Sequence, residues 1–313
     1  MVPSSPPIVD THTHLDDLAF ALDRDEVLEA SRAVGVRHFV NIGYAPDSWE
    51  TSRLLRDKHP DVEIALGLHP QQAGQFGPEL VRDLSRAIRD LKPVAVGETG
   101  FDFARPGPSF EEQERAFRAQ LEIAATEELP TIIHQRDAAD ALIAELDRWP
   151  SLPPIVLHSF DGTHRLTDWA IERGCFIGIG GLATKRSSAD LRERIARISV
   201  DRLLLETDSP YLAPPGAASR RNTPANLPAI AAILAPLWNL SGEELCWATS
   251  ANAVALFARP AVNWLSELAE DERIVASPTA RRHLESWEDS RDSESLAIKY
   301  FDPGARRPRA CVT

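Results

Sequence analysis

His12 and His14 stand two positions apart, just where the apolar segment "PPIVDT" ends. In an extended chain, side chains two positions apart point the same way, so both imidazoles project together from the end of a strand. Imidazoles paired in this way usually bind a metal ion. The alternative for so short a motif is two half-exposed histidines at a strand end that bind nothing.

Further polar residues occupy the same kind of position. Glu98, His134 and His158 close the apolar segments "PVAVGE", "PTIIH" and "PIVLH", and Asp208 follows "RLLLET". Taken singly, each has a structural explanation as a hydrogen-bonded histidine, a helix cap or a solvated acid. Their joint placement after apolar segments favours a shared site. His69 in "GLHP" also follows such a segment, and we expect it to contact the metal ligands without binding an ion itself.

One divalent ion takes fewer than six ligands from protein when a position must stay open for substrate. Four imidazoles and two carboxylates therefore favour two ions over one. Glu98 is the candidate bridge, because each of its two oxygens can bind one ion. The predicted ligands are His12, His14 and Asp208 for one ion, and His134 and His158 for the other. Paired divalent ions activate water near neutral pH and stabilise both oxygens of an in-line displacement.

Glu98 and Asp208 are also the candidate catalytic residues. A carboxylate beside a metal ion stays ionised at pH 7, so Asp208 can hydrogen-bond the attacking water and accept its proton. Sites made of imidazole and carboxylate accept Mg2+, Mn2+ or Zn2+ according to geometry and availability. The predicted chemistry is therefore metal-dependent hydrolysis, with the native metal left open.

The elements that must position these residues alternate regularly. The strand candidates are 8–11, 36–42, 62–68, 93–98, 130–134, 154–158, 175–179 and 202–207. The helix candidates are 24–34, 47–58, 78–91, 110–128, 137–147, 163–173, 188–197, 224–239 and 241–257. Apolar strands interleaved with helices indicate a parallel sheet, and eight such units favour an α/β (β/α)8 TIM barrel over a doubly wound open sheet. In a barrel the strand ends surround one mouth, where distant residues converge.

The composition is that of a globular protein, with 43% hydrophobic and 26% charged residues among 313. The formal net charge of -13 repels polyanions, so a nucleic-acid substrate must be attracted by local basic groups or bound cations. Three widely spaced cysteines, Cys175, Cys246 and Cys311, predict neither a zinc ribbon nor a disulfide framework. With no leader or membrane-spanning pattern, we expect a cytoplasmic protein without membrane contact.

Six segments, in chain order, resemble a known family: "DTHTHLDD", "GLHP", "VGETGFDF", "LPTIIHQRDA", "LHSF" and "LLLETDSPYLAP". They are similar to the TatD-type metal-dependent deoxyribonucleases of the amidohydrolase superfamily, and the resemblance runs from about residue 8 to residue 257. It implies a (β/α)8 barrel and Mg2+- or Mn2+-dependent hydrolysis of DNA, often from the 3′ end of single strands. The family's metal-binding positions match His12, His14, Glu98, His134, His158 and Asp208.

The sequence departs from the family pattern near the predicted mouth. Ser159 and Asp161 stand where the family usually has Cys and Ser, which adds a negative charge. The loop "PPGAASRR" lacks the usual aromatic and keeps only Arg220 and Arg221 as a basic pair. We expect substrate phosphates to contact a basic rim at the mouth of the barrel. Each residue of this rim could equally be a solvated surface charge. The predicted rim consists of Arg136, Arg220 and Arg221, with Lys185 and Arg186 nearby.

The sequence divides into a predicted barrel, 1–257, and a C-terminal extension of unknown role, 258–313, that offers a surface for a protein partner. The leading hypothesis is a 3′–5′ exonuclease on single-stranded or short DNA. One rival is a hydrolase of the same superfamily acting on a small amide, lactone or phosphoester. The other is a non-catalytic adaptor whose barrel only holds metal.

Overall fold

The computed structural model of the protein describes residues 7–257, so the predictions for the extension 258–313 lie outside the described residues. Eight strands form one sheet in which every neighbour in the chain is a parallel neighbour in space. The strands are β1 (Ile8–Thr13), β2 (Val36–Gly43), β3 (Val62–Leu66), β4 (Ala95–Asp102), β5 (Thr131–Arg136), β6 (Ile155–Leu157), β7 (Phe176–Ile179) and β8 (Leu203–Leu205). The predicted (β/α)8 barrel is confirmed, and the doubly wound alternative is wrong because its strand order would not follow the chain.

The sheet closes between its first and last strands. Thr13 forms a parallel bridge with Ser209 just after β8. The backbone N–H of His14 donates to the oxygen of Ser209 at 2.8 Å, and that of Asp208 donates to the oxygen of His12 at 2.9 Å. The seam of the barrel therefore places both histidines beside Asp208.

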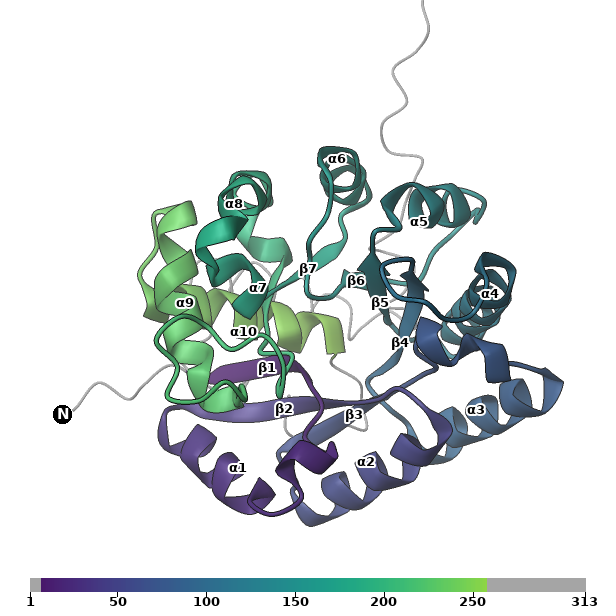
Figure 1. The fold of residues 1–313 in the computed structure, drawn as a ribbon, viewed down its shortest axis with the longest axis horizontal. Coiled ribbons are helices and arrows are strands. Elements are labelled where there is room, and N and C mark those ends of the chain that lie inside the picture. Colours follow the sequence, from purple (N-terminus) through teal and green to yellow (C-terminus); the bar gives the residue numbers. More distant parts are fainter. Residues whose placement is uncertain (1–6, 258–313) are drawn as a thin grey trace, which may run out of the picture.

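Helices surround the strands (Figure 1). They are α1 (Arg24–Ala33), α2 (Pro46–Lys58), α3 (Pro78–Leu91), α4 (Phe110–Thr126), α5 (Ala139–Leu146), α6 (His164–Arg173), α7 (Gly181–Thr184), α8 (Ala189–Ile195), α9 (Leu227–Leu234) and α10 (Gly242–Phe257). Short 3-10 turns lie at Leu18–Phe20, Pro70–Gln75, Arg186–Ser188, Val200–Arg202, Pro224–Asn226 and Ala235–Trp238. None of the helices between residues 7 and 257 combines the length and apolar character needed to cross a bilayer.

The predicted helix at 224–239 is broken into a 3-10 turn, α9 and a second 3-10 turn. Proline accounts for the break, because it lacks the N–H of a helical hydrogen bond and its ring clashes with the preceding turn. Pro224 and Pro228 are tolerated at element starts, whereas Pro236 follows the last turn of α9. The prediction of one uninterrupted helix over 224–239 was therefore wrong.

Strand β4 differs from the prediction in a way that matters for the site. It continues to Asp102 instead of ending at 98, and its register with β5 shifts between Gly97 and Thr99, so Glu98 is the extra residue of a bulge. Gly97 has φ of 144°, and a Cβ there would meet the backbone oxygen of Ile132 at 2.5 Å. Glu98 thus lies within the strand, and the bulge sets the direction of its side chain.

Candidate metal centre

Glu98 is at the centre of a group of imidazoles. Its Oε1 lies 2.6 Å from Nδ1 of His134 and 2.7 Å from Nε2 of His158. Its other oxygen, Oε2, lies 3.5 Å from Nε2 of His12. Nε2 of His69 is 3.7 Å from Oε1, while Nδ1 of the same ring accepts the backbone N–H of Gln71 at 3.1 Å. Glu98 therefore has each oxygen facing different histidines, as a bridging carboxylate requires.

Asp208 occupies the other side of His12. Its Oδ1 lies 3.4 Å from Nε2 of His14 and 3.9 Å from Nε2 of His12. The Asp208 side chain is 15% exposed, whereas the Glu98 side chain is 4% exposed. Asp208 is therefore the more solvent-exposed carboxylate of the pair.

The donor atoms fit a divalent cation. Within residues 7–257, buried ring nitrogens without a hydrogen-bond partner gather here: both of His12, Nδ1 of His14, Nε2 of His134 and Nδ1 of His158. Buried polar atoms without partners are costly, and a bound cation would satisfy them. One possible ligand group is His12, His14 and Asp208, and another is Glu98, His134 and His158, each with its atoms within 4.8 Å. Two further groups of close atoms are His12, His158 and Glu206, and His69, Asp102 and His134, so the division of ligands between ions stays a prediction.

The pKa values show how strongly these charges are coupled. Burial opposes ionisation of Glu98, but the charges of His158 and His69 and the close approach of His12 and His134 outweigh it, so the pKa of Glu98 lies well below its usual value. Burial also disfavours a charged His14, yet Asp208 beside it raises the pKa of that imidazole. Protons and a divalent cation compete for the same atoms, so metal binding here must release protons.

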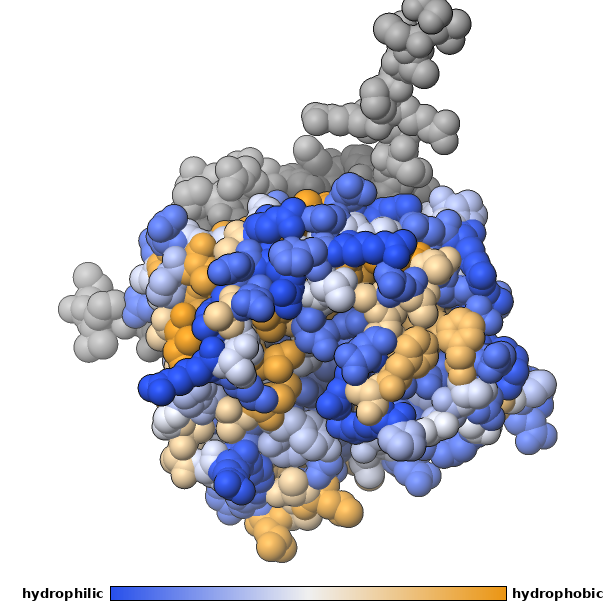
Figure 2. Space-filling view, turned by 45° about the horizontal axis from the view of Figure 1, so that its top comes forward, coloured by the Kyte–Doolittle hydropathy of each residue, from blue (hydrophilic) through white to orange (hydrophobic). Residues whose placement is uncertain are grey.

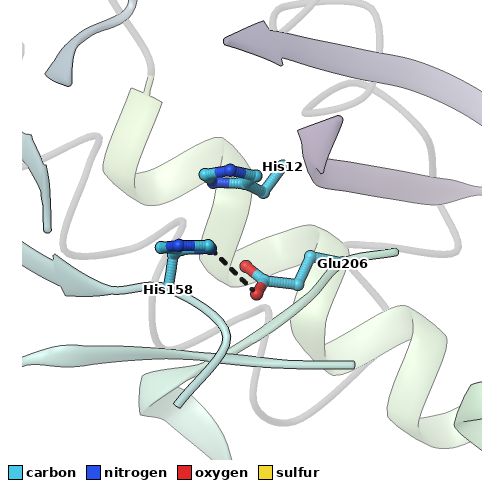
Figure 3. Close-up of side chains that lie close together, drawn as sticks. All are labelled: His12, His158 and Glu206. Atoms are coloured by element: carbon cyan, nitrogen blue, oxygen red, sulfur yellow. Dashed lines mark ion pairs between the residues drawn. The ribbon is translucent and has the colours of Figure 1, made fainter. Parts of the chain in front are cut away.

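Glu206 is a site residue that the sequence reasoning missed. It is 1% exposed, accepts the backbone N–H of Ser159 at 2.5 Å and has Oε1 3.6 Å from Nδ1 of His158 (Figure 3). The rings of His12 and His158 stack at 3.8 Å with an angle of 11° between them. Imidazole binds metal in its own plane, so two parallel stacked rings do not point at one shared ion. The Glu206 carboxylate faces the ring nitrogen of His158 that points away from Glu98.

Two glycines of the β7 segment admit the Glu206 side chain. A Cβ at Gly178 would collide with Oε2 of Glu206, and one at Gly180 would meet the backbone oxygen of Glu206 at 2.6 Å. The sequence held a signal for this residue, because Glu206 is two positions from Asp208 in the quoted segment "LLLETDSPYLAP". Side chains two apart in an extended segment share a direction.

Asp102 was also missed, because the fourth strand was predicted to end at 98. It is the last residue of β4, is 1% exposed, and has Oδ2 3.5 Å from Nε2 of His134. Asp102, His69 and His134 form a further group of close donor atoms. The Asp102 carboxylate thus faces the ring nitrogen of His134 opposite to the one that meets Glu98.

The predicted substrate arginines have different surroundings. Arg221 forms an ion pair with Asp23 at 2.5 Å, and its guanidinium lies 5.0 Å from the ring of Phe20. Arg136 is exposed at the end of β5, and Arg220 is exposed in the loop after β8. Arg136 and Arg220 have room to meet a phosphate, whereas Arg221 would first have to leave Asp23.

Comparisons with known proteins agree with this geometry. The model of the TatD related DNase family matches residues 9–258. A relative from Salmonella typhimurium named 3′-5′ ssDNA/RNA exonuclease TatD is 37% identical over 257 residues, covering 79% of this chain and 98% of the relative. A protein of the same name from Klebsiella pneumoniae is 38% identical over 258 residues, covering 79% of this chain and 97% of the relative.

Solved structures give the same result. YJJV, a TatD homologue from Escherichia coli K12, has a TM-score of 0.75 and 30% identity, covering 81% of this chain and 98% of that one. A TatD family hydrolase from Entamoeba histolytica has a TM-score of 0.73 at 21% identity, covering 81% of this chain and 98% of that one, which is a likeness of fold. The family predicted from the six sequence segments is confirmed, and the chain belongs to the TatD related DNase family.

Proposed function

We propose that this protein is a cytoplasmic, metal-dependent 3′–5′ exonuclease that hydrolyses phosphodiester bonds of single-stranded DNA. The observation that carries the proposal is the convergence of four histidines on Glu98 and Asp208 at one end of the barrel. Relatives named 3′-5′ ssDNA/RNA exonuclease support the substrate class, with single-stranded RNA as an additional candidate.

The proposed cofactor is one or two divalent ions, Mg2+ or Mn2+ in preference to Zn2+. When bound, such ions supply activation of water near neutral pH and stabilisation of negative charge on the phosphoryl oxygens. Glu98 would bridge two ions. The proposed ligands are His12, His14 and Asp208 for one and His134 and His158 for the other.

The residues of the centre have different roles in the proposed reaction. Asp208 is ionised, because its hydrogen bond with His14 and the charges of neighbouring histidines outweigh burial and lower its pKa. It is also more exposed than Glu98, so a carboxylate oxygen of Asp208 is placed to accept the proton of the attacking water. Glu98 and the four histidines would hold the ions, and His69 and Glu206 would orient these ligands.

A second candidate is hydrolysis of a small amide, lactone or phosphoester. The net charge of -13 favours it, as does Asp161, which adds a carboxylate hydrogen-bonded to Gln135 next to His134. Activity on a panel of small esters without activity on oligonucleotides would select this candidate.

The deciding experiment is digestion of a 5′-labelled single-stranded oligonucleotide with Mg2+ or Mn2+, beside Glu98→Ala and the control Glu193→Ala on the exposed side of α8. The nuclease predicts a ladder of shortened products that requires metal, persists in Glu193→Ala and disappears in Glu98→Ala. A 3′-labelled strand should release its label at once. Intact oligonucleotide with all three proteins, while the wild type and Glu193→Ala bind metal, would contradict the nuclease.

A further inference from the structure

Two exposed phenylalanines follow β4, the strand that carries Glu98 and Asp102. Phe103 and Phe110 are 41% and 42% exposed, and their ring centroids lie 6.1 Å apart. Phe103 directly follows Asp102, whose carboxylate lies 3.5 Å from His134. Large apolar side chains exposed side by side form a surface that a ligand can cover. Figure 2 shows such apolar areas, in orange, among hydrophilic side chains on one face of the molecule.

The pair rests on a rigid base. Buried Phe101 lies beneath both rings, 5.8 Å from Phe103 and 5.7 Å from Phe110, and packs in turn against buried Phe117 at 5.2 Å. The Phe110 ring is nearly parallel to that of Phe101, at 23°. Aromatic side chains fixed in this way present a surface without losing much conformational entropy when a ligand binds.

The loop that carries Phe103 is also fixed. Gln113 of α4, which is 2% exposed, accepts the backbone N–H of Asp102 at 2.9 Å and donates to the oxygen of Pro108 at 2.9 Å. The backbone N–H of Phe103 donates to the oxygen of Arg136 at 3.0 Å. The distance between this aromatic surface and His134 is therefore set by the barrel itself.

Two arginines flank the aromatic surface. In the described part of the chain, neither Arg105 nor Arg136 has a hydrogen bond or ion pair through its guanidinium. Arg105 is exposed and follows Phe103 by two positions. Arg136 follows His134 on β5 by two positions. Unpaired guanidinium groups beside exposed aromatic rings are the usual means of binding single-stranded nucleic acid.

We propose that Phe103 and Phe110, whose ring planes meet at 66°, form a platform on which a base of a single-stranded substrate stacks on the face of one ring and contacts the edge of the other, while Arg105 and Arg136 bind its backbone phosphates. This inference rests on the proposed nuclease function and assigns the substrate to the β4–α4 side of the mouth. Stacking needs only the flat face that every base has, and it forms no hydrogen bonds to the base. The platform therefore binds without sequence preference. Inside a duplex, stacked neighbours cover the faces of the bases, so the platform favours single strands.

The test separates base stacking from phosphate binding. The probes are a 5′-fluorescein oligothymidylate with phosphorothioate linkages, which resist hydrolysis in Mg2+, and an otherwise identical strand with abasic nucleotides at its 3′ end. Kd is measured for the full-length wild type and for Phe103→Leu/Phe110→Leu, which keeps apolar side chains but removes the aromatic faces. We expect the variant to bind the intact strand about 5- to 100-fold more weakly, and to bind the abasic strand as the wild type does.

Two further variants serve as comparison. Arg105→Gln should weaken binding of intact and abasic strands alike, because it removes a phosphate contact. Leu54→Ala, at a 53% exposed position on α2, should change neither Kd. Melting temperatures of all variants establish that each protein folds.

Each contrary result has a separate meaning. If the double variant binds the intact strand like the wild type, or loses affinity for both strands equally, the platform is overturned. The nuclease function survives that result provided that the wild type still degrades an oligonucleotide with ordinary linkages. If the wild type neither binds nor degrades any oligonucleotide, the platform is overturned together with the nuclease.

Discussion

At the scale of single residues, the two carboxylates of the centre differ in their exposure to solvent. Glu98 is enclosed by histidines, whereas Asp208 reaches the mouth. Behind them, Glu206 contacts His158 on the side away from Glu98, so that imidazole has a carboxylate facing each ring nitrogen. Such an arrangement fixes the tautomer and raises the basicity of a metal-binding histidine.

Glu206→Gln should weaken Mn2+ binding about 10- to 100-fold, because the amide keeps the size of the side chain but removes the charge next to His158. Isothermal titration of Mn2+ into wild type, Glu206→Gln and the exposed control Glu193→Gln measures the effect. The melting temperature of the metal-free proteins should change little by comparison. Equal Mn2+ affinity in all three proteins would argue against an orienting role for Glu206.

His38 on β2 makes stability depend on pH. It is 8% exposed, and burial, opposed by Asp61 and reinforced by Arg37, lowers its pKa from 6.5 to about 3. The unfolded chain therefore binds this proton first as the pH falls. The contribution of neutral His38 is fully present above 6.5 and is lost as the pH falls toward 3, at up to about 1.4 kcal/mol per pH unit.

We therefore expect the free energy of unfolding to fall by about 2 kcal/mol more in the wild type than in His38→Gln between pH 6.5 and pH 5. Urea unfolding at the two pH values gives the comparison. His164→Gln, at the exposed start of α6, should behave as the wild type does. The same loss in all three proteins would assign the pH dependence to other groups.

At the scale of elements, β4 carries the most consequential irregularity. Its bulge makes Glu98 the extra residue between Gly97 and Thr99, and the strand then continues far enough to bring Asp102 to His134. Bulges commonly redirect a side chain next to an active site. The element thus supplies two carboxylates to the centre.

Gly97→Ala should destabilise the protein by about 1–3 kcal/mol and weaken Mn2+ binding, since the new Cβ would meet Ile132 and force the bulge to move. Gly77→Ala is the matched control, because a Cβ at Gly77 meets nothing within 4 Å. Urea unfolding and Mn2+ titration measure both effects. If Gly97→Ala matched Gly77→Ala in both measurements, β4 would not be the element that constrains Glu98.

At the scale of the whole molecule, the centre joins segments from β1, β4, β5, β6 and the end of β8. A cation bound there links strands on both sides of the seam that closes the barrel. Anything that binds only the folded state stabilises it in proportion to the logarithm of its concentration over Kd.

Chelation of divalent metal should therefore lower the melting temperature, by about 5 to 10 °C for a metal concentration near 100 times Kd. Differential scanning calorimetry with and without EDTA makes the measurement. Glu98→Ala should show a much smaller difference between the two conditions, because its site is already impaired. A wild type that melts at one temperature in both conditions would contradict metal binding by the native state.

The sequence by itself determined the barrel and the neighbourhood of its ligands. Short, near-continuous apolar segments alternate with amphipathic helices, and this local pattern predicted all eight strands, while six short segments predicted the family. Residues at the ends of parallel strands must meet at one mouth, so His12, His158 and Asp208 could be placed together without coordinates. The assignment of each residue to a metal or to catalysis stays a prediction that the experiments above test.

Only the tertiary structure decided which atoms face one another. The bulge in β4 depends on register with β5, the space for Glu206 depends on glycines of the next strand, and Arg221 pairs with Asp23 across 198 positions of chain. Local periodicity reports which face a side chain takes and how elements alternate. Pairing between distant residues depends instead on register and on the space left by packing, which a single local segment does not encode.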